Sequence, residues 1–477
     1  MRTTRRGRRT LLMATPLLAL IFVVACAARA TDQPASSPAD ASATASTDSP
    51  AAVQPSPAAT ASAPAGVEAA NVAAVDAGAK AGAPAVAAAE WPQWRGPNRD
   101  GLAAGVTLPS AWPKELKQGW RVTVGIGHSS PVVSNGVIYQ FARQGEEEVL
   151  LALDSATGKE LWRAGAVPAP YTVNPAASDH GKGPKSTPVV ANGRVFTLGI
   201  AGLLSAHDAK TGRLIWRKDF SKQFPTTSPL YGTAMSPVVV GDLLIAHVGG
   251  HDKGALVAFD AASGAVKWSY DADGPAYASP VVLTAGGERQ VVTFTQKELV
   301  AVSAATGALL WKLPAKTQYD TNCNTPVVYK DTVVVSFEGG GVVALRPARE
   351  GGKWTAKEVW KNEENELSMN TPVLAGSTLY GLSMRKKGQF FAVDATTGKT
   401  LWQGPGRMGE NAAIVGVGGT LLALTNDAVL YVLPAASSFA PSVQYTVATS
   451  QTWAHPVVLG DQLLVKDETT LASLSLK

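Results

Sequence analysis

Cysteine is nearly absent from this chain of 477 residues, which contains only Cys26 and Cys323. Two cysteines cannot supply the disulfide framework of a small secreted domain, and no Cys-x-x-Cys pattern is present. The fold must therefore be held together by its apolar core. The sequence around Cys323 offers no activating group, so we expect a buried or partly buried small side chain and not a nucleophile.

Charge is also scarce, because charged residues make up 17% of the sequence and hydrophobic residues 45%. The formal net charge of +5 is carried entirely by the first 25 residues, which contain five arginines and no acid. The rest of the chain is neutral by this count. The basic balance therefore belongs to an N-terminal targeting segment, and we expect no nucleic-acid partner.

Common catalytic signatures are missing, since no HExxH, GxSxG or P-loop pattern occurs. The glycine-rich stretch 415–419 lacks the strand, turn and helix of a nucleotide-binding loop. His247 and His251 have the spacing of one helix face, but Gly249-Gly250 between them indicates a loop. The histidine pair therefore does not predict a metal site.

A second candidate metal site has the alternating oxygen-bearing residues of a calcium loop. Asp320-Thr321-Asn322-Cys323-Asn324 begins the pattern, and Asp331 falls at its twelfth position. Thr325, however, stands where a calcium loop requires glycine, and the residues after it form an apolar strand pattern. We therefore expect no catalytic, cofactor-binding or metal-binding residue from these motifs.

The first 30 residues have the parts of an export signal. Arginines come first, the uncharged apolar stretch 11–25 follows, and Val23-Val24-Ala25-Cys26 then forms a lipobox pattern. The apolar stretch is short for a membrane span but typical of a signal-peptide core. We interpret residues 1–26 as a signal peptide with lipidation at Cys26. Cleavage after Ala28 or Ala30, or retention as an uncleaved membrane anchor, are the alternatives.

Residues 27–90 are dominated by Ala, Pro, Ser and Thr. Such a composition cannot bury enough apolar surface to offset the entropy of ordering the chain. We expect a disordered tether, with a root-mean-square span on the order of 40 Å for about 60 residues. It would hold a domain formed by residues 91–477 away from the membrane, in the periplasm or at the cell surface.

The remainder of the chain repeats itself with a period of 43 to 57 residues, as counted between the prolines of an apolar strand opener. The seven clear openers are Ser130-Pro131-Val132-Val133, Thr187-Pro188-Val189-Val190, Ser236-Pro237-Val238-Val239, Ser279-Pro280-Val281-Val282, Thr325-Pro326-Val327-Val328, Thr371-Pro372-Val373-Leu374 and His455-Pro456-Val457-Val458. A degenerate eighth copy is Ala412-Ala413-Ile414-Val415. Eight β-rich units of this length predict an eight-bladed β-propeller of the all-β class.

The second half of each unit is a hairpin with the pattern AxDxxTGxxxW. Its aspartate is expected to accept hydrogen bonds from turn amides, its glycine to take a positive φ, and its tryptophan to pack between blades. The aspartates are Asp154, Asp208, Asp260 and Asp394; the glycines are Gly158, Gly212, Gly264, Gly307 and Gly398; the tryptophans are Trp162, Trp216, Trp268, Trp311, Trp360 and Trp402. In the fifth unit residues 346–352 lengthen the hairpin, and in the seventh Pro434 and Tyr445 replace the aspartate and the tryptophan.

Closure of the ring is also predicted by the sequence. The last unit stops at Lys477 without a tryptophan strand, whereas Trp120, upstream of the first opener, lies in a segment that matches such a strand. We expect this N-terminal strand to complete the eighth blade, which removes exposed strand edges at the junction.

The recurring hairpin resembles the repeat of propellers named after the quinone cofactor PQQ, and the resemblance covers about residues 91–477. Residues 91–101, WPQWRGPNRDG, are similar to the opening motif of many secreted bacterial members. This turn-rich motif is expected to cap the propeller.

The resemblance implies two possible functions, because the fold alone does not choose between them. Quinoprotein dehydrogenases stack PQQ between a tryptophan and a disulfide of adjacent cysteines, and they bind calcium. Non-catalytic scaffolds include the lipoprotein of the outer-membrane β-barrel assembly machinery. This chain has no adjacent cysteines. We therefore expect a non-catalytic scaffold without a cofactor, in cell-envelope assembly; a PQQ- and calcium-dependent alcohol or sugar dehydrogenase is the alternative.

Long connections are the expected binding elements. Residues 164–185, with Tyr171, Asp179, His180, Lys182 and Lys185, make the first repeat step the longest. Similar segments are 220–231 and 361–370. For each of the three segments the alternative is an ordinary solvated connection without a binding role. We expect a monomer that binds a protein or peptide partner at one rim of the propeller and the membrane through its lipid.

Overall fold

A computed structural model describes residues 90–220, 223 and 229–477. The expected signal peptide, Cys26 and nearly all of the expected tether lie outside the described residues, so these assignments stay predictions. Within the described residues no helix has the length and apolar character needed to cross a membrane.

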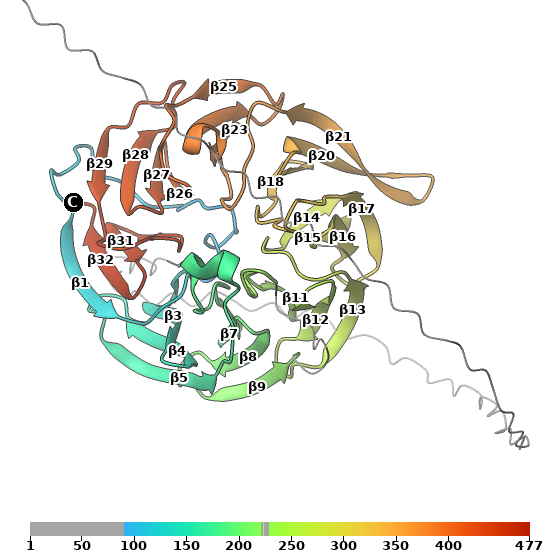
Figure 1. Cartoon of the computed structure of the whole chain (residues 1–477), viewed down its shortest axis with the longest axis horizontal. Helices are drawn as coiled ribbons and strands as arrows, with labels where there is room; N and C mark the ends of the chain where they lie inside the picture. Colours follow the sequence, from blue (N-terminus) through green and yellow to red (C-terminus); the bar gives the residue numbers. More distant parts are fainter. Residues whose placement is uncertain (1–89, 221–222, 224–228) are drawn as a thin grey trace, which may run out of the picture. The chain divides into compact units, whose positions relative to one another are not determined.

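The described residues form eight antiparallel sheets of four strands, which Figure 1 shows arranged as a closed ring of blades. We number the blades along the chain. Blade 1 contains β2 (Val132–Ser134), β3 (Val137–Gln144), β4 (Glu147–Asp154) and β5 (Glu160–Pro168); blade 2 contains β6 (Val189–Ala191), β7 (Arg194–Leu198), β8 (Leu203–Asp208) and β9 (Leu214–Asp219); blade 3 contains β10 (Val238–Val240), β11 (Leu243–Gly250), β12 (Lys253–Asp260) and β13 (Val266–Ala272); blade 4 contains β14 (Val281–Ala285), β15 (Glu288–Phe294), β16 (Glu298–Ser303) and β17 (Leu309–Pro314).

The second half of the ring repeats the same strand order. Blade 5 contains β18 (Val327–Tyr329), β19 (Thr332–Phe337), β20 (Gly341–Glu350) and β21 (Lys353–Asn362); blade 6 contains β22 (Val373–Ala375), β23 (Thr378–Ser383), β24 (Gln389–Asp394) and β25 (Thr400–Gln403); blade 7 contains β26 (Ala412–Val417), β27 (Thr420–Thr425), β28 (Val429–Pro434) and β29 (Val443–Thr446); blade 8 contains β30 (Val457–Leu459), β31 (Gln462–Lys466), β32 (Thr470–Ser475) and β1 (Lys117–Thr123). Two short 3-10 helices lie in connections, η1 (Pro175–His180) and η2 (Arg385–Lys387).

The eight-bladed architecture and its closure confirm the predictions from the sequence. β1 pairs with β32, and Trp120 stands opposite Ser473 in this pairing. The outer strand of blade 8 therefore comes from the N-terminal side of the propeller and the other three strands from the C-terminal end. The extra residues of the fifth unit extend β20 and β21 into a long hairpin that leaves the circumference of the ring (Figure 1).

The apolar core lies between neighbouring blades. One cluster joins Phe196 of blade 2 to Phe259 of blade 3, and another joins Phe294 of blade 4 to Val333 and Val335 of blade 5. All five side chains are almost completely buried. Because full burial of such a side chain stabilises the fold by roughly 1.5–3 kcal/mol, each unit gains its core by stacking on the next.

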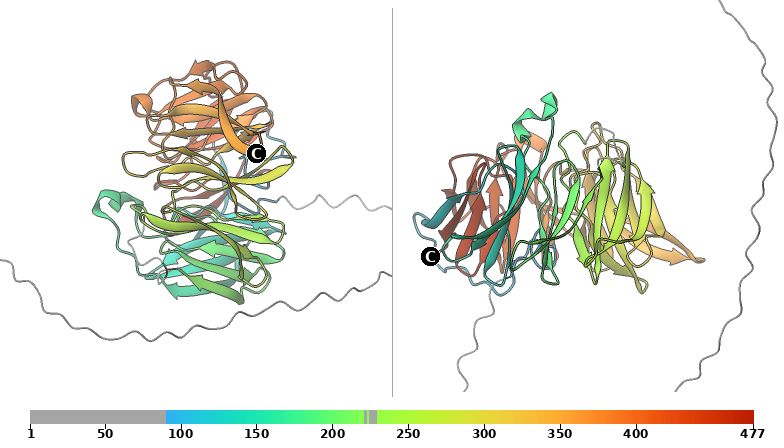
Figure 2. Two further views of the ribbon diagram at one scale, coloured as in Figure 1. Left: turned by 90° about the vertical axis from the view of Figure 1, so that its right-hand side faces the viewer. Right: turned by 90° about the horizontal axis from the view of Figure 1, so that it is seen from below.

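Every blade-to-blade connection reaches the same face of the ring. The innermost strand of each blade runs away from this face and the second strand runs back to it, because the strands are antiparallel. The turn between the second and third strands therefore also lies on this face. Figure 2 shows the connection that contains η1 rising from one face. We call this side the connection face. The expected binding segments 164–185 and 361–370 belong to connections on it, whereas most of segment 220–231 lies outside the described residues.

Candidate functional site

The repeat aspartates and glycines lie in the turns on the opposite face. The Oδ1 atom of Asp154 accepts hydrogen bonds from the amide and hydroxyl of Thr157 at 2.9 and 2.6 Å. Gly158 follows with φ +71°. Asp208, Asp260 and Asp394 accept the equivalent bonds. The hydroxyl and amide of Ser263, together with Lys267, lower the pKa of the Asp260 carboxyl to about 2. These residues stabilise turns and do not line the axial cavity described below.

The repeat tryptophans join adjacent blades. Each of five indole rings lies against the turn glycine of the following blade; the pairs are Trp120 with Gly158, Trp162 with Gly212, Trp216 with Gly264, Trp268 with Gly307 and Trp360 with Gly398. Trp311 differs because the turn of blade 5 is extended, and its Nε1 donates to Oε1 of Gln290 at 2.8 Å. Trp402 donates to the carbonyl of Ala436 at 2.9 Å. None of these rings borders the central cavity described below.

A belt of hydrogen bonds runs around the axis through the first residue of each opener. The backbone amide of one opener donates to the hydroxyl of the next; the bonds are Ser130 to Thr187, Thr187 to Ser236, Ser236 to Ser279, Ser279 to Thr325 and Thr325 to Thr371, all at 2.9–3.1 Å. His455 donates to Ser130 Oγ at 2.8 Å. The belt of hydroxyl acceptors ends at blade 7, where Ala412 has no hydroxyl. The Ser-Pro and Thr-Pro repeats carried this signal, but sequence reasoning assigned them only to strand starts.

Residues 91–103 run along the innermost strands and do not merely cap one end. Trp91 bridges to Val133 of blade 1, and Leu102 bridges to Gly416 of blade 7. Figure 1 shows this blue segment crossing the middle of the ring. The segment therefore joins blade 1 to blade 7 through two backbone bridges.

Two buried arginines fix this segment. An Nη2 atom of Arg95 donates to the carbonyl of Pro372 at 2.6 Å, and Arg99 donates to the carbonyls of Ser236 and Pro237 at 3.0 Å each. Burial lowers the pKa of Arg95 to about 10 and that of Arg99 to about 9, so both remain protonated at neutral pH. The segment thereby bonds to blades 3 and 6 across the axis.

A cavity of about 140 Å³ opens on the axis at the connection face. Each of the eight blade-to-blade connections contributes to its lining; the lining residues from these connections include His128, His180, Lys185, Tyr231, Tyr277, Cys323, Asn370, Asn411 and Trp453. Four hydroxyl residues of the belt, Ser236, Ser279, Thr325 and Thr371, also line it. Trp94 borders the cavity from residues 91–103, with its ring centroid 4.4 Å from that of His455.

Aromatic rings form a continuous arc along this cavity. His128 stacks on Trp453 at 5.6 Å between centroids, and His180 contacts Trp453 and Tyr231 at 4.8 Å each. Tyr231 continues to Tyr277 at 5.4 Å. His180 is the last residue of η1, so the structure brings the long connection 164–185 to the axis.

Burial shifts the pKa values of several polar groups in the cavity. Burial lowers the pKa of Lys185 to about 8, although Glu148 opposes this shift, and burial also lowers the pKa values of His128 and His180. Burial raises the pKa of the Cys323 thiol to about 12, which leaves almost no thiolate at neutral pH. Among the described residues that line the cavity there is no aspartate or glutamate. The described lining therefore offers neither a carboxylate nor a reactive thiolate, and its ionisable side chains include His128, His180 and Lys185.

The calcium-loop pattern is used for other contacts. The Nδ2 atom of Asn322 donates to the carbonyls of Thr295, Gln296 and Ala315, so its amide supports a loop. Asp331 pairs with Arg346 at 2.8 Å. These side chains do not converge on one point.

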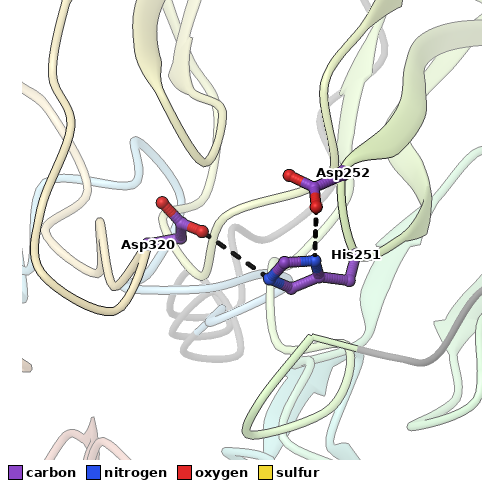
Figure 3. A group of neighbouring side chains, drawn as sticks. All are labelled: His251, Asp252 and Asp320. Carbon is purple, nitrogen blue, oxygen red and sulfur yellow. Dashed lines mark ion pairs between the residues drawn. The ribbon is translucent and has the colours of Figure 1, made fainter. Parts of the chain in front are cut away.

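The two histidines of the i, i+4 pair are separated by the end of β11. His247 is buried within β11, where its Nε2 contacts the carbonyl of Asp273 at 3.1 Å. His251 lies in the exposed β11–β12 turn between Asp252 and Asp320 (Figure 3). No helix aligns the two histidines, as expected, but the loop expected at Gly249-Gly250 is wrong, because these residues end strand β11. The neighbours of His251 could not be read from the local sequence.

Comparison with known families identifies the group to which this propeller belongs. The model of the family described as "Outer membrane protein assembly factor BamB" matches residues 145–404, which is more than half of the chain. The chain belongs to this family.

Relatives include both functional branches. The outer membrane protein assembly factor BamB of Shewanella oneidensis is 26% identical over 232 residues, which cover 45% of this chain and 55% of that protein. The dehydrogenase subunit of the quinone alcohol dehydrogenase of Gluconacetobacter polyoxogenes is 25% identical over 326 residues, which cover 60% of this chain and 41% of that protein. The chain thus spans about half the length of the curated relatives that it matches.

A solved structure supports the fold at lower sequence identity. The crystal structure of BamB from Moraxella catarrhalis has a TM-score of 0.55 and 16% identity, and the match covers 76% of this chain and 97% of that one. At this identity the likeness concerns the fold.

The residues of the BamB-family propeller described here do not fit a PQQ and calcium site. The resemblance to dehydrogenases implies a vicinal disulfide, but Cys323 is the sole described cysteine in the chain and is free. Calcium prefers six to eight oxygen ligands with carboxylates among them, whereas the cavity offers the amides of Asn370 and Asn411, several hydroxyls and the ammonium of Lys185. A cation in the cavity would meet the ammonium of Lys185, and no carboxylate is among the described lining residues.

Proposed function

We propose that this protein is an exported, lipid-anchored and non-catalytic propeller that binds a protein partner during outer-membrane protein assembly. Membership of the BamB family supports the process. The lining of the axial cavity carries the argument against a PQQ-dependent enzyme, because the described lining has no carboxylate to bind calcium and its thiol is free, with a raised pKa. Protein binding needs neither group.

The partner binds at the connection face in this proposal. That face carries η1, which stands away from the ring, and the arc of His128, His180, Trp453 and Tyr231 (Figure 2). Tyr319, with 61% of its surface exposed, adds a large aromatic side chain from the connection between β17 and β18. Aromatic side chains are enriched in the energetically dominant positions of protein interfaces.

Affinity purification from detergent-solubilised envelopes tests this assignment. The wild-type protein is expected to recover outer-membrane assembly proteins, and a variant with Tyr319→Ser and His180→Ser is expected to recover at least tenfold less. A control with Leu161→Ser and Val266→Ser removes exposed apolar side chains from outer strands of blades 1 and 3. Equal loss in both variants would exclude a specific connection-face contact.

A PQQ-dependent alcohol or sugar dehydrogenase is the alternative function, and the sequence relation to a quinone alcohol dehydrogenase favours it. Purified protein is incubated with PQQ and calcium, dialysed and assayed for dye reduction with alcohols and sugars. The non-catalytic proposal expects no retained quinone absorbance. Stoichiometric quinone with substrate-dependent dye reduction would overturn it.

The membrane anchor is tested separately at Cys26. Cys26→Ala is expected to release the protein from membranes into the soluble periplasmic or extracellular fraction. Unchanged membrane retention would refute lipidation at this residue and would favour the uncleaved N-terminal anchor. Size-exclusion chromatography of the released protein tests the expectation of a monomer.

A further inference from the structure

A group of three potential metal ligands lies on the connection face outside the axial cavity. His251 and Asp252 form the turn between β11 and β12 of blade 3, and Asp320 lies in the connection from β17 to β18. One ligand atom from each residue lies within 4.8 Å of the other two. The chain therefore brings one imidazole and two carboxylates together from positions about 70 residues apart in the sequence.

Asp252 holds the His251 ring in place through one of its nitrogens. The Nδ1 atom of His251 lies 2.8 Å from Oδ2 of Asp252, and Oδ1 of Asp252 pairs with Nζ of Lys297 at 2.7 Å. The amide of Asp252 also donates to Oε1 of Gln296 at 2.9 Å. This carboxylate is thus fixed from blade 4 and is satisfied without a metal.

The second nitrogen of His251 faces Asp320 across a wider gap. Its Nε2 atom lies 3.6 Å from Oδ2 of Asp320 (Figure 3). That separation exceeds the 2.7–2.9 Å of a charge-assisted hydrogen bond. Two ligands on one tetrahedral zinc ion, each about 2.1 Å from it, lie about 3.4 Å apart. The Nε2–Oδ2 gap therefore has the width of a shared metal ion.

We propose that His251 Nε2 and the Asp320 carboxylate bind a divalent transition-metal ion, with Asp252 orienting the imidazole from its other nitrogen. A hydrogen bond from the free ring nitrogen to a carboxylate is the usual partner of a metal-bound histidine. An imidazole with a carboxylate suits zinc, nickel or copper, whereas calcium and magnesium require oxygen ligands. His251 is 44% exposed, so water completes the coordination.

The site would connect three blades at the binding face. Asp252 belongs to blade 3, its partner Lys297 lies in the β15–β16 turn of blade 4, and Asp320 precedes blade 5. Asp320 stands three residues before Cys323, which lines the axial cavity. Metal binding would therefore fix the position of a loop that borders the proposed protein-binding surface. The metal site itself does not depend on the identity of the partner.

Calorimetric titration of the tag-free full-length protein with zinc chloride at neutral pH tests the proposal. One equivalent of zinc is expected to bind. His251→Ala and Asp320→Asn should each weaken binding at least tenfold, and Asp252→Asn, which removes the charge of the orienting group, by on the order of 10–100-fold. Asp331→Asn is the matched control, because Asp331 is an exposed carboxylate that pairs with Arg346; it should leave zinc binding unchanged.

X-ray absorption at the zinc edge gives a readout of the ligands. The wild-type spectrum should contain the multiple-scattering features of one imidazole, and His251→Ala should lose them. Absence of saturable zinc binding, or zinc affinity in His251→Ala and Asp320→Asn equal to that of the wild type, would overturn the site and leave His251 as a side chain paired with two carboxylates. Melting temperatures of all variants without zinc establish that the substitutions preserve the fold.

Discussion

The indole of Trp120 lies against Gly158, and its Nε1 atom donates a hydrogen bond to the carbonyl oxygen of Ser155 at 3.2 Å. Trp120 belongs to the outer strand of blade 8, whereas Ser155 and Gly158 form the β4–β5 turn of blade 1. The contact therefore closes the ring at the junction between its first and last blades. A Cβ atom at Gly158 would stand 2.6 Å from Cε3 of Trp120.

Replacement of Gly158 by alanine should destabilise this junction more than a matched replacement elsewhere. Gly193 has the same φ of +71°, but an added Cβ there meets no atom within 4 Å. Gly193→Ala should cost about 1–2 kcal/mol from the left-handed backbone alone. Gly158→Ala should cost about 1–3 kcal/mol more because it overpacks against Trp120. Denaturant unfolding followed by tryptophan fluorescence measures both; equal losses would contradict the proposed role of the contact.

The hydroxyl belt predicts a stability cost for removing one oxygen. Ser279→Ala deprives the buried amide of Ser236 of its acceptor, which lies 2.9 Å away. An unsatisfied buried donor costs about 1–3 kcal/mol. Ser178→Ala, which removes an exposed hydroxyl in η1, should change the free energy of unfolding by less than about 0.5 kcal/mol. A loss at Ser279 as small as that at Ser178 would show that water replaces the belt without cost.

The strands and turns could be predicted from the sequence because the same strand, turn and tryptophan pattern recurs in each repeat. Asp260, Gly264 and Trp268 have fixed spacing, so one hairpin predicts the others. The ring closure was predictable for the same reason, since Trp120 lies in a copy of the outer-strand pattern that stands before the first blade in the sequence. The extended hairpin of blade 5 was visible as extra residues, although pairing of β20 with β21 over its length was not.

The axial cavity could not be predicted in the same way. Its wall takes single residues from connections that do not repeat, such as His128 and Trp453, whose stacking joins positions about 325 residues apart. Lys185 belongs to the connection 164–185 that the sequence singled out as a binding element, but its place at the axis, where desolvation lowers its pKa, could not be read from the sequence. Likewise, the contact of His251 with Asp320 depends on blade packing, which neither local spacing nor composition records.

Two buried histidines predict a loss of stability in mild acid. Desolvation lowers the pKa of His247 to about 4 and that of His455 to about 3, whereas an unfolded histidine titrates near 6.5. Below about pH 6.5 these histidines bind protons in the unfolded chain but not in the folded chain. The free energy of unfolding therefore falls with falling pH until the folded pKa is reached. Each histidine contributes a slope of up to about 1.4 kcal/mol per pH unit.

His455→Gln isolates this contribution. The variant removes one titrating group, so its unfolding free energy should vary less steeply than that of the wild type between about pH 6 and pH 4. Urea titrations at several pH values measure the difference in slope, which cancels the carboxylates common to both proteins. Parallel profiles would mean that His455 is protonated in the folded protein, in conflict with its burial beside Trp94.

The last prediction concerns the reactivity of Cys323. Desolvation raises its thiol pKa to about 12, against about 8.5 for a free cysteine, so its thiolate fraction near pH 8 should fall on the order of a thousandfold. Iodoacetamide should therefore alkylate Cys323 far more slowly in the folded protein than in urea, as followed by peptide mass spectrometry. The folded rate should also keep rising with pH through pH 10, because ionisation lies above that range. A rate close to that of the unfolded chain would place a reactive thiolate in the axial cavity, and the non-catalytic assignment would lose its main chemical support.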